Sequence, residues 1–192
     1  YFIIPGLSSY NVPVISLSIP VDEMLGKNGF YNNYMPTGSI TAERPRGLAS
    51  FEMFDRDGDR VGYSNVELAV SGNGSSGLRM KSMRVYFKGS SNEGAGLQSD
   101  LDYDVFDGLA RDVNGNAITS SRLLLRNSGN DCGHSYIRDA YMQRMAADLR
   151  VDSMASVTTM VFINGEFWGV YNLRERYSPE YVESHYGIDK DN

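Results

Sequence analysis

The dipeptide Asn164-Gly165 constrains the fold of this chain more than any other feature of the sequence. It separates two apolar runs, Val157 to Ile163 and Glu166 to Leu173. Asn-Gly is the strongest short signal for a β-hairpin, because both residues of the tight turn must adopt a positive φ. Bulky side chains occupy both faces of the two runs, so we expect a central pair of strands that is covered on both sides.

Further strands are predicted upstream of this hairpin. The segment from Val12 to Ile19 is β-branched and bounded by prolines, which predicts an edge strand because proline cannot donate to a β-ladder. Three later segments predict an antiparallel meander: Ser50 to Phe54, Ser64 to Val70, and Lys81 to Lys88. The DRDGDRVG sequence at 55–62 predicts a hairpin turn and not a calcium loop, because no glutamate follows at the twelfth position.

Helices are predicted in three places. Asp22 to Tyr34 reads as a short helix that runs into a polar loop. Ser135 is the expected N-cap of a second helix, which follows a short strand at Leu123 to Leu125. One face of that helix is expected to pack through apolar residues spaced by four: Ile137, Tyr141, Met145 and Leu149. Ser178 and Pro179 predict the start of a final helix, and the Gly-rich stretch Asn92 to Gln98 predicts a mobile connection.

Composition excludes several classes of protein. The 18 Lys and Arg against 24 Asp and Glu give a formal charge of −6, which argues against a general nucleic-acid surface. No apolar run approaches the ~20 residues that cross a bilayer. Cys132 is the only cysteine, so an intrachain disulfide and a cysteine zinc site are both excluded. His134 and His185 lack a partner at helical spacing, and no metal site is predicted.

Several uncommon sequence motifs in the second half of the chain resemble the CotH kinase family, the spore-coat CotH-like atypical protein kinases. These motifs are RNSGND, IRDA, NGEFWGVYNLRER and SHYG. The resemblance extends upstream through KSMRVYF at 81–87 and more loosely to VPVISLSI near the start. The resemblance implies an ATP- and Mg²⁺-dependent kinase that phosphorylates Ser or Thr of secreted, cell-envelope or spore-surface proteins. It also implies that ATP and a protein substrate are the partners.

The order of predicted elements favours an α+β fold, with one helix packed on an antiparallel sheet as in the small lobe of a protein-kinase-like fold. The 192 residues suffice for one domain or for one lobe of a larger protein. By analogy with kinases, the hinge would lie at 172–178. Because the chain starts at Tyr1 and stops at Asn192, we expect it to be the N-terminal portion of a CotH-like kinase domain without its catalytic lobe.

Lys81 is the sharpest single candidate for nucleotide binding. It shares strand parity with Met83 and Val85, so it should face the same apolar side and require an anionic partner. In CotH-like kinases the matching KS-x-R run supplies the lysine that is expected to hold ATP phosphates, and Lys81 with Arg84 matches it. The alternative is an edge-strand lysine that discourages aggregation. The nearby Gly72 to Gly77 matches G-x-G-x-x-G, but its context fits neither a dinucleotide fold nor a Walker loop, and we favour a flexible strand connection over a kinase glycine-rich loop.

A second group of candidates gathers at the junctions around the predicted second helix. Arg126 is predicted to contact the nucleotide, and Asp139 or Glu175 to fix Lys81 as a carboxylate does in kinases. Supporting roles are predicted for four further residues: Asn127, Asp131, Arg138 and Arg174. The alternative is helix capping combined with a structural network of arginines and carboxylates.

The resemblance places the catalytic base and the Mg²⁺ ligands beyond the SHYG helix, in the larger lobe. We therefore expect no catalytic or metal-binding residue within this chain, weak nucleotide binding and no phosphate transfer by the 192 residues alone. The alternative function is a non-catalytic, β-rich surface module that binds carbohydrate or protein. Lys81→Ala should abolish ATP binding in the first case and leave ligand binding intact in the second.

Overall fold

The computed structural model describes residues 6, 10–33, 44–87, 100–149 and 151–191. Its strands are β1 (Val14–Ser18), β2 (Gly47–Phe54), β3 (Arg60–Ser71), β4 (Ser82–Tyr86), β5 (Arg122–Arg126), β6 (Ser156–Ile163) and β7 (Glu166–Arg174). Its α-helices are α1 (Val21–Leu25), α2 (Arg138–Ala146) and α3 (Pro179–Tyr186). Two short 3₁₀ turns lie at Gly74–Gly77 and Gly129–Asp131.

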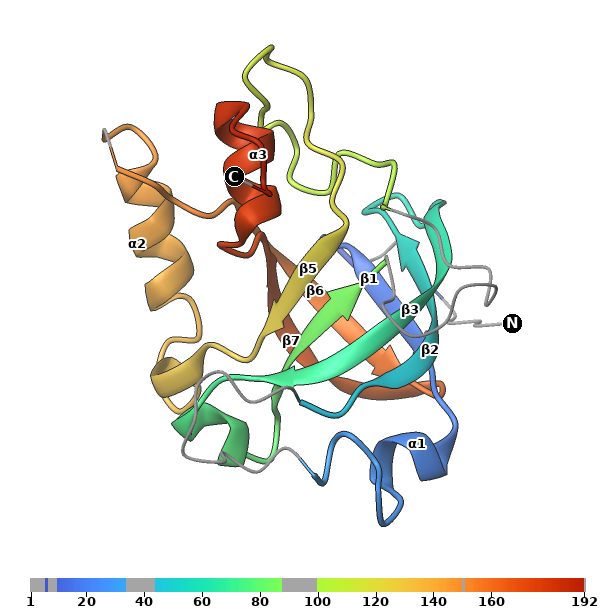
Figure 1. Ribbon diagram of the computed structural model, residues 1–192. Coiled ribbons are helices and arrows are strands. Elements are labelled where there is room, and N and C mark those ends of the chain that lie inside the picture. The colour runs from blue at the N-terminus through green and yellow to red at the C-terminus, as the bar shows by residue number, and fades with distance from the viewer. Residues whose placement is uncertain (1–5, 7–9, 34–43, 88–99, 150, 192) are drawn as a thin grey trace.

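The strands form a closed barrel in the order β1-β2-β3-β4-β5-β7-β6 (Figure 1). The predicted antiparallel meander is confirmed for β2, β3 and β4. β1, however, is not an edge strand, because it pairs antiparallel with β2 and parallel with β6, where Val14 lies opposite Met160. The prediction of an α+β sheet with a packed helix, resembling the small lobe of a kinase, is therefore wrong: the sheet closes on itself.

The predicted Asn164-Gly165 hairpin is confirmed, and its turn also helps to close the barrel. Both turn residues have positive φ, 53° and 86°. The Asn164 side chain accepts a hydrogen bond from Ile19 N–H at 2.8 Å and donates one to the Ile19 carbonyl at 3.0 Å. Met160 N–H donates to the Pro13 carbonyl at the other end of the β1–β6 pair, at 3.0 Å. One asparagine thus shapes the turn and fixes β1 beside it.

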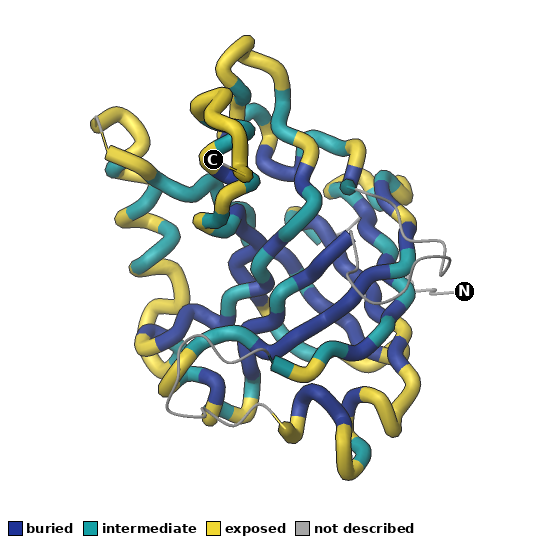
Figure 2. Tube along the Cα trace, in the orientation of Figure 1, coloured by how far each residue is buried: buried dark blue, intermediate teal, exposed yellow. Residues whose placement is uncertain are grey.

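Alternation along the strands fills the barrel with apolar side chains. Met83 and Val85 on β4 and Leu123 and Leu125 on β5 are all 0% exposed and belong to one core cluster. Figure 2 shows this burial concentrated in the strands, with exposed residues in the loops and helices. Because side chains alternate along a strand, the residues between these four, Arg84 and Leu124, point outward.

The two longer helices differ in how they meet the barrel. α3 begins as predicted, because the Ser178 hydroxyl accepts a hydrogen bond from Tyr181 N–H at 3.3 Å. α2 contains no buried residue, and the predicted packing stripe is 55–64% exposed along Ile137, Tyr141, Met145 and Leu149. The prediction that this stripe packs on the sheet is wrong, because the closed barrel buries its own core and needs no helix to cover it.

Other expectations are settled in part. The short helix predicted at the start of Asp22 to Tyr34 is confirmed as α1, and the predicted loop follows it; Tyr34 lies outside the described residues. The predicted connection at Asn92 to Gln98 also lies outside them. The 55–62 turn is confirmed, since Asp57 N–H and Asp59 N–H both donate to Asp55 Oδ1. Among the described residues, no helix is long and apolar enough to cross a membrane.

Candidate functional site

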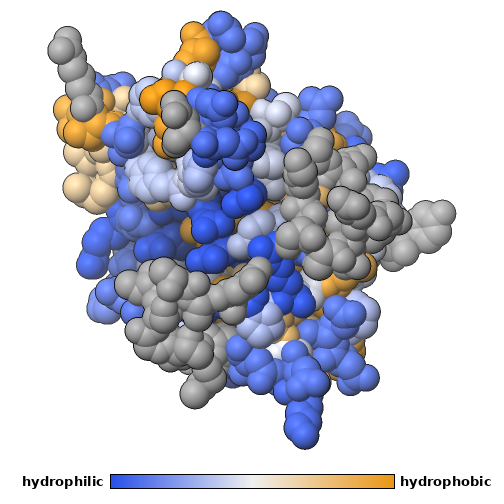
Figure 3. Space-filling model, viewed as in Figure 1, coloured by the Kyte–Doolittle hydropathy of each residue, from blue (hydrophilic) through white to orange (hydrophobic). Residues whose placement is uncertain are grey.

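Arginines line the outer face of the barrel across β4, β5 and β7. The strand register sets them in rows: Arg84 lies opposite Leu124, which lies opposite Arg174. In a neighbouring row, Arg126 lies opposite Asn172. Figure 3 shows hydrophilic side chains gathered in a hollow in the middle of this side of the molecule. We call this surface of β4, β5 and β7, with α2 at its border, the arginine face.

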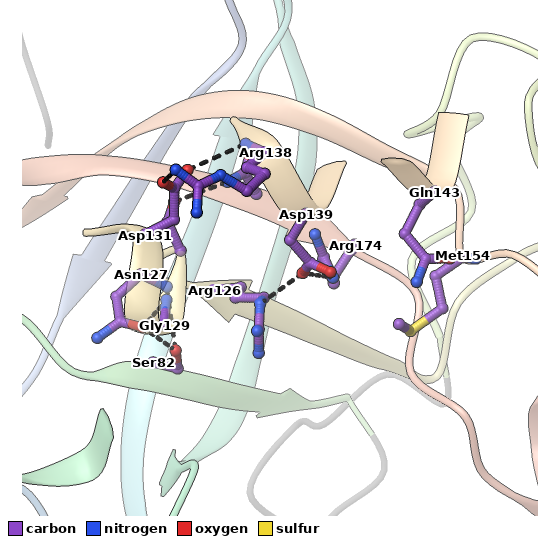
Figure 4. Close-up of polar contacts among 12 residues, drawn as sticks. Ser82, Arg126, Asn127, Gly129, Asp131, Arg138, Asp139, Gln143, Met154 and Arg174 are labelled. Atoms are coloured by element: carbon purple, nitrogen blue, oxygen red, sulfur yellow. Dashed lines mark hydrogen bonds and ion pairs between the residues drawn. The ribbon is translucent and has the colours of Figure 1, made fainter. Parts of the chain in front are cut away.

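The centre of the arginine face is an ion-pair cluster of Arg126, Asp139 and Arg174 (Figure 4). Asp139 Oδ2 lies 2.7 Å from Arg174 Nη1 and 2.9 Å from Arg126 Nε. The Arg174 side chain is only 1% exposed, whereas those of Arg126 and Asp139 are 33% and 38% exposed. Two guanidinium groups share one carboxylate, so the cluster carries a surplus positive charge at the surface.

Two nitrogen atoms of the Arg174 guanidinium donate no hydrogen bond to the described residues. Its Nε and Nη2 atoms are buried and have no hydrogen-bond partner among the described residues. Burial lowers the pKa of Arg174 from its usual value, and the nearby Asp139 carboxylate opposes that shift. A buried guanidinium with unused donors is costly. The cluster would therefore gain from an additional anion or another hydrogen-bond acceptor.

Asp131 positions α2 so that Asp139 can reach these arginines. Its carboxylate accepts hydrogen bonds from the Ser135 hydroxyl at 2.6 Å and from Arg138 N–H at 3.0 Å. The Ser135 hydroxyl, the largest influence, and the Arg138 and Ser135 N–H groups lower the pKa of Asp131, although burial opposes them. Arg138 Nη2 lies 3.4 Å from the same carboxylate. The predicted cap, Ser135, thus acts through Asp131 and not as the N-cap itself.

Asn127 ties the loop before α2 to β4. Its Oδ1 accepts hydrogen bonds from the Ser82 hydroxyl at 2.7 Å and from Gly129 N–H at 3.0 Å, while its own N–H donates to Ser82 Oγ at 3.0 Å. Asn127 is fully buried. Gly129 has a φ of 57°, and Ser128 has a φ of 66°, so the chain turns sharply here. This rigid loop carries Arg126 and Asp131 at fixed positions.

A groove separates α2 from β6 and β7. Its volume is about 350 Å³, and its lining mixes apolar and polar side chains. Apart from its ion pairs, α2 is anchored across this groove by Gln143 Oε1, which accepts a hydrogen bond from Met154 N–H at 2.9 Å. Polar contacts at its two ends, and no apolar core, hold α2 in place.

Lys81 lies on the other side of β4, at the end of the barrel. Its ammonium donates to the Ser76 carbonyl at 2.8 Å and to the Leu78 carbonyl at 3.0 Å, and it lies 5.3 Å from the centre of the Tyr31 ring. The residue is 6% exposed, and burial lowers the pKa of Lys81. Lys81 therefore secures the Gly72 to Gly77 connection from inside.

Glu175 also lies apart from the ion-pair cluster. Its Oε2 accepts a hydrogen bond from Ala155 N–H at 2.8 Å, and its Oε1 lies 2.7 Å from His185 Nε2. Glu175 thereby joins the end of β7 to α3. The described contacts of Asp139 are with Arg126 and Arg174, so both predicted carboxylate partners of Lys81 are engaged elsewhere.

The structure thus brings together Arg126, Asp139 and Arg174, with Arg84 in the same row as Arg174. It separates Lys81 and Glu175 from them, and it uses Asn127, Asp131 and Arg138 to shape the start of α2. These contacts are those of the alternative prediction, a capped helix with an arginine–carboxylate network. A role of each residue in nucleotide binding stays a prediction.

Sequence reasoning missed the residues around Tyr86 on β4. Arg46 lies over the Tyr86 ring, with Cζ 4.3 Å from its centre, and Arg122 approaches the ring with Cζ at 5.7 Å. Arg176 also contacts Tyr86. The available signal was strand parity, because Tyr86 and Arg122 alternate with core residues and so point outward.

The chemistry of this face suits anions better than metal ions. Guanidinium groups present flat pairs of donors that match phosphate and carboxylate oxygens. In the part of the chain that the structure describes, no group of three or more His, Cys, Asp or Glu side chains could hold a metal ion. The guanidinium groups of this face are therefore suited to the oxygens of phosphate or carboxylate groups.

Comparison with known proteins points to one family. The family model described as "CotH kinase protein" matches residues 68–192. The match begins within β3 and includes Arg84, Arg126, Asp139 and Arg174. The search of curated proteins found no match. The arginine face therefore lies almost entirely within the matched region.

Proposed function

This chain belongs to the CotH kinase family, and we propose that it is the nucleotide-covering part of an ATP-dependent protein kinase. In this proposal the full protein transfers phosphate from ATP with Mg²⁺ to Ser or Thr of a secreted, cell-envelope or spore-surface protein. The choice of hydroxyl substrate and its location rest on the family resemblance alone.

The observation that supports nucleotide binding is the surplus of guanidinium groups in the ion-pair cluster. Arg126 and Arg174 share the single carboxylate of Asp139. Arg84, in the row of Arg174, has no ion pair with a carboxylate among the described residues, and its Nε donates to Ser71 Oγ at 3.3 Å. Phosphoryl transfer depends mainly on positioning and charge stabilisation, for which such fixed cations are suited.

Each residue has a distinct part in the proposal. Arg126 and Arg84, which are partly exposed, bind phosphate oxygens. Arg174 and Asp139 orient Arg126, because Asp139 joins the two guanidinium groups. Mg²⁺, when bound with ATP, would neutralise phosphate charge, but these residues supply none of its ligands.

Titration with a fluorescent ATP analogue tests the proposal. We expect weak binding by the 192-residue chain, and a loss of about tenfold or more in affinity for Arg126→Ala. Arg60→Ala is the matched control, because Arg60 pairs with Glu52 at 3.1 Å on the β2–β3 hairpin, outside the arginine face. Equal binding by the two variants would contradict the proposal. Phosphate transfer by the chain alone would contradict its assignment as a covering part.

A second candidate function is a non-catalytic module that binds carbohydrate or protein. The closed barrel favours it, because the fold lacks the open sheet and packed helix expected for a kinase small lobe. Titration of the same chain with ATP discriminates the two. A module of this kind would show no change at Arg84 or Arg126 when ATP is added, whereas the kinase proposal requires one.

A further inference from the structure

A second set of arginines surrounds Tyr86, at the opposite end of the arginine face from Arg126. We call Arg46, Tyr86, Arg122 and Arg176 the Tyr86 cluster. Arg46 and Arg122 approach the tyrosine ring with Cζ at 4.3 and 5.7 Å from its centre. Arg176 also contacts Tyr86. Three guanidinium groups are thus gathered on one aromatic side chain, which holds them in a defined arrangement.

The carboxylates near this cluster do not balance its charge. Arg46 pairs with Glu67 at 2.7 Å, and Arg122 pairs with Glu180 at 2.7 Å. Arg176 has no ion pair with a carboxylate among the described residues. A further cation, Arg84, lies beside the cluster, and Arg44 lies near Arg84. In addition to burial, the charge of Arg84 lowers the pKa of Arg176 and the pKa of Arg44.

This local charge contrasts with that of the whole chain. Four arginines stand in or beside the Tyr86 cluster, Arg46, Arg84, Arg122 and Arg176, and the ion pairs described for them are with two carboxylates, in a protein whose formal charge is −6. Burial first, and then the neighbouring charges of Arg84 and Arg122, lower the pKa of Arg176. Mutual repulsion of this kind weakens the isolated surface and is relieved when an anionic partner binds.

The Tyr86 cluster is separate from Arg126, whereas Arg84, the other proposed nucleotide contact, lies between the two. Tyr86 lies opposite Arg122, whereas Arg126 lies opposite Asn172, four residues further along β5. Four strand residues span about 13 Å. A ligand at one position does not need to occupy the other, so the two can be tested with different variants.

The shape of the cluster suits a peptide better than a single small anion. Its cations come from three separate segments, the one before β2, β5 and the loop before α3, and so they offer several anchoring points around one ring. Beside Arg122 and Arg176 lies a hollow of about 40 Å³, which is lined partly by serines and by Glu175 and Glu180; both glutamates are paired, with His185 and Arg122 respectively. Tyrosine and arginine are also the side chains that most often dominate protein interfaces.

We propose that the Tyr86 cluster is a docking site for an acidic segment of a protein. Carboxylates of an extended segment pair with Arg122 and Arg176, while the buried Tyr86 ring holds the Arg46 guanidinium in place beside them. The proposal rests on the proposed kinase function to the extent that it names the class of protein substrate, one that carries an acidic segment.

Binding of a fluorescein-labelled oligo-glutamate peptide, followed by anisotropy, tests the docking site. We expect binding that weakens with added salt, and a loss of about tenfold or more in the double variant Arg122→Gln, Arg176→Gln. Arg176→Gln alone serves if the double variant unfolds, because Arg176 has no ion pair with a described carboxylate to lose. It is expected to show a smaller loss in the same direction.

Arg60→Ala is a closely matched control. Arg60 also lies over a tyrosine, with Cζ 5.4 Å from the centre of the Tyr63 ring, and it also pairs with a glutamate, but no other arginine contact is described there. The proposal is overturned if the unmodified chain does not bind the peptide, if Arg60→Ala weakens binding as much as Arg176→Gln, or if inorganic phosphate displaces the peptide as readily as free oligo-glutamate does.

The result is distinguishable from a failure of the proposed nucleotide site. Arg126→Ala should lose ATP and keep the peptide, and Arg176→Gln should lose the peptide and keep ATP. If only peptide binding is seen, the docking site stands without the nucleotide proposal. If both ligands are lost together in each variant, the two sites are one surface and the docking proposal is wrong.

Discussion

α2 and α3 are similar in length but are held by different forces. α3 has a serine N-cap and a glycine with φ 67° at its C-cap, and its Tyr181 is 8% exposed. The Tyr181 ring stacks on His185 with centroids 4.1 Å apart. α2 has no side-chain cap at its N-cap residue and no buried residue, and it depends on ion pairs and a few hydrogen bonds.

The difference shows where the molecule can respond to a charged ligand. Apolar packing and local capping change little when ions are added, whereas contacts between partly exposed charges weaken with salt and compete with bound anions. α3 also has ion pairs, from Glu180 to Arg122 and from His185 to Glu175, but its serine cap and its buried Tyr181 do not depend on them. α2 is the part whose position depends on the charge of the arginine face, which is where we place the nucleotide.

The largest effect is expected when the charge that holds α2 is removed. Asp139→Ala leaves the buried Arg174 without its carboxylate and should lower the free energy of unfolding by roughly 2 kcal/mol, less than for a fully buried pair because Asp139 is 38% exposed. Urea denaturation measures this. Asp148→Ala, at an exposed carboxylate just beyond α2, is the control and should have almost no effect.

A smaller effect is expected from the cap that holds α3. Ser178→Ala removes the acceptor of Tyr181 N–H and should cost about 1 kcal/mol. Hydrogen exchange should show faster opening of α3 and unchanged opening of α2. Faster exchange in α2 as well would mean that the two helices are coupled, which would contradict the conclusion that different contacts hold them.

Acid should release α2 through Asp131. Because hydrogen bonds lower the pKa of Asp131 in the folded state, its contribution is present above the usual aspartate value of 3.8 and is lost as the pH falls through the lower, folded value. Hydrogen exchange of α2 between pH 5 and pH 2 measures this with about half-unit steps. Asp131→Asn should remove the acid-dependent step, and a step that persists would assign it to another group.

The smallest effect is expected from high salt, which should change the hydrogen-exchange rates of the two helices by different amounts. At about 1 M salt the Debye length is near 3 Å, so the contact of Asp139 with the partly exposed Arg126 is screened. Exchange of α2 amides should quicken by a small factor, and exchange of α3 amides by less, because α3 keeps its serine cap and its buried Tyr181 when its pair of Glu180 with Arg122 is screened. An equal response in both helices would remove the distinction between them.

Features that depend on residues close together in the chain, such as turns and helix caps, could be predicted from the sequence. Asn164-Gly165 required two positive φ values and formed the expected hairpin, and Ser178 capped the helix that it was expected to cap. The buried side of Lys81 followed from its parity with Met83, although its partners proved to be backbone carbonyls that a side-chain pattern does not reveal.

What the sequence could not predict depends on distant contacts. The parallel pair of Val14 with Met160 closes the barrel, but residues 146 apart leave no local pattern that marks them as partners. The stripe of Ile137 and Tyr141 was correctly placed on one face of a helix, yet spacing alone cannot say whether anything covers that face. Predicting the ion-pair cluster required both the strand pairing and the position of α2, since the cluster joins β5, β7 and α2.

NMR observation of the arginine side-chain N–H groups during titration with ATP tests whether nucleotide binds to the arginine face. We expect the Nε–H signals of Arg84 and Arg126 to shift as ATP is added, while that of Arg60 on the β2–β3 hairpin does not. Absence of a shift at Arg84 and Arg126, or an equal shift at Arg60, would contradict the placing of nucleotide on the arginine face.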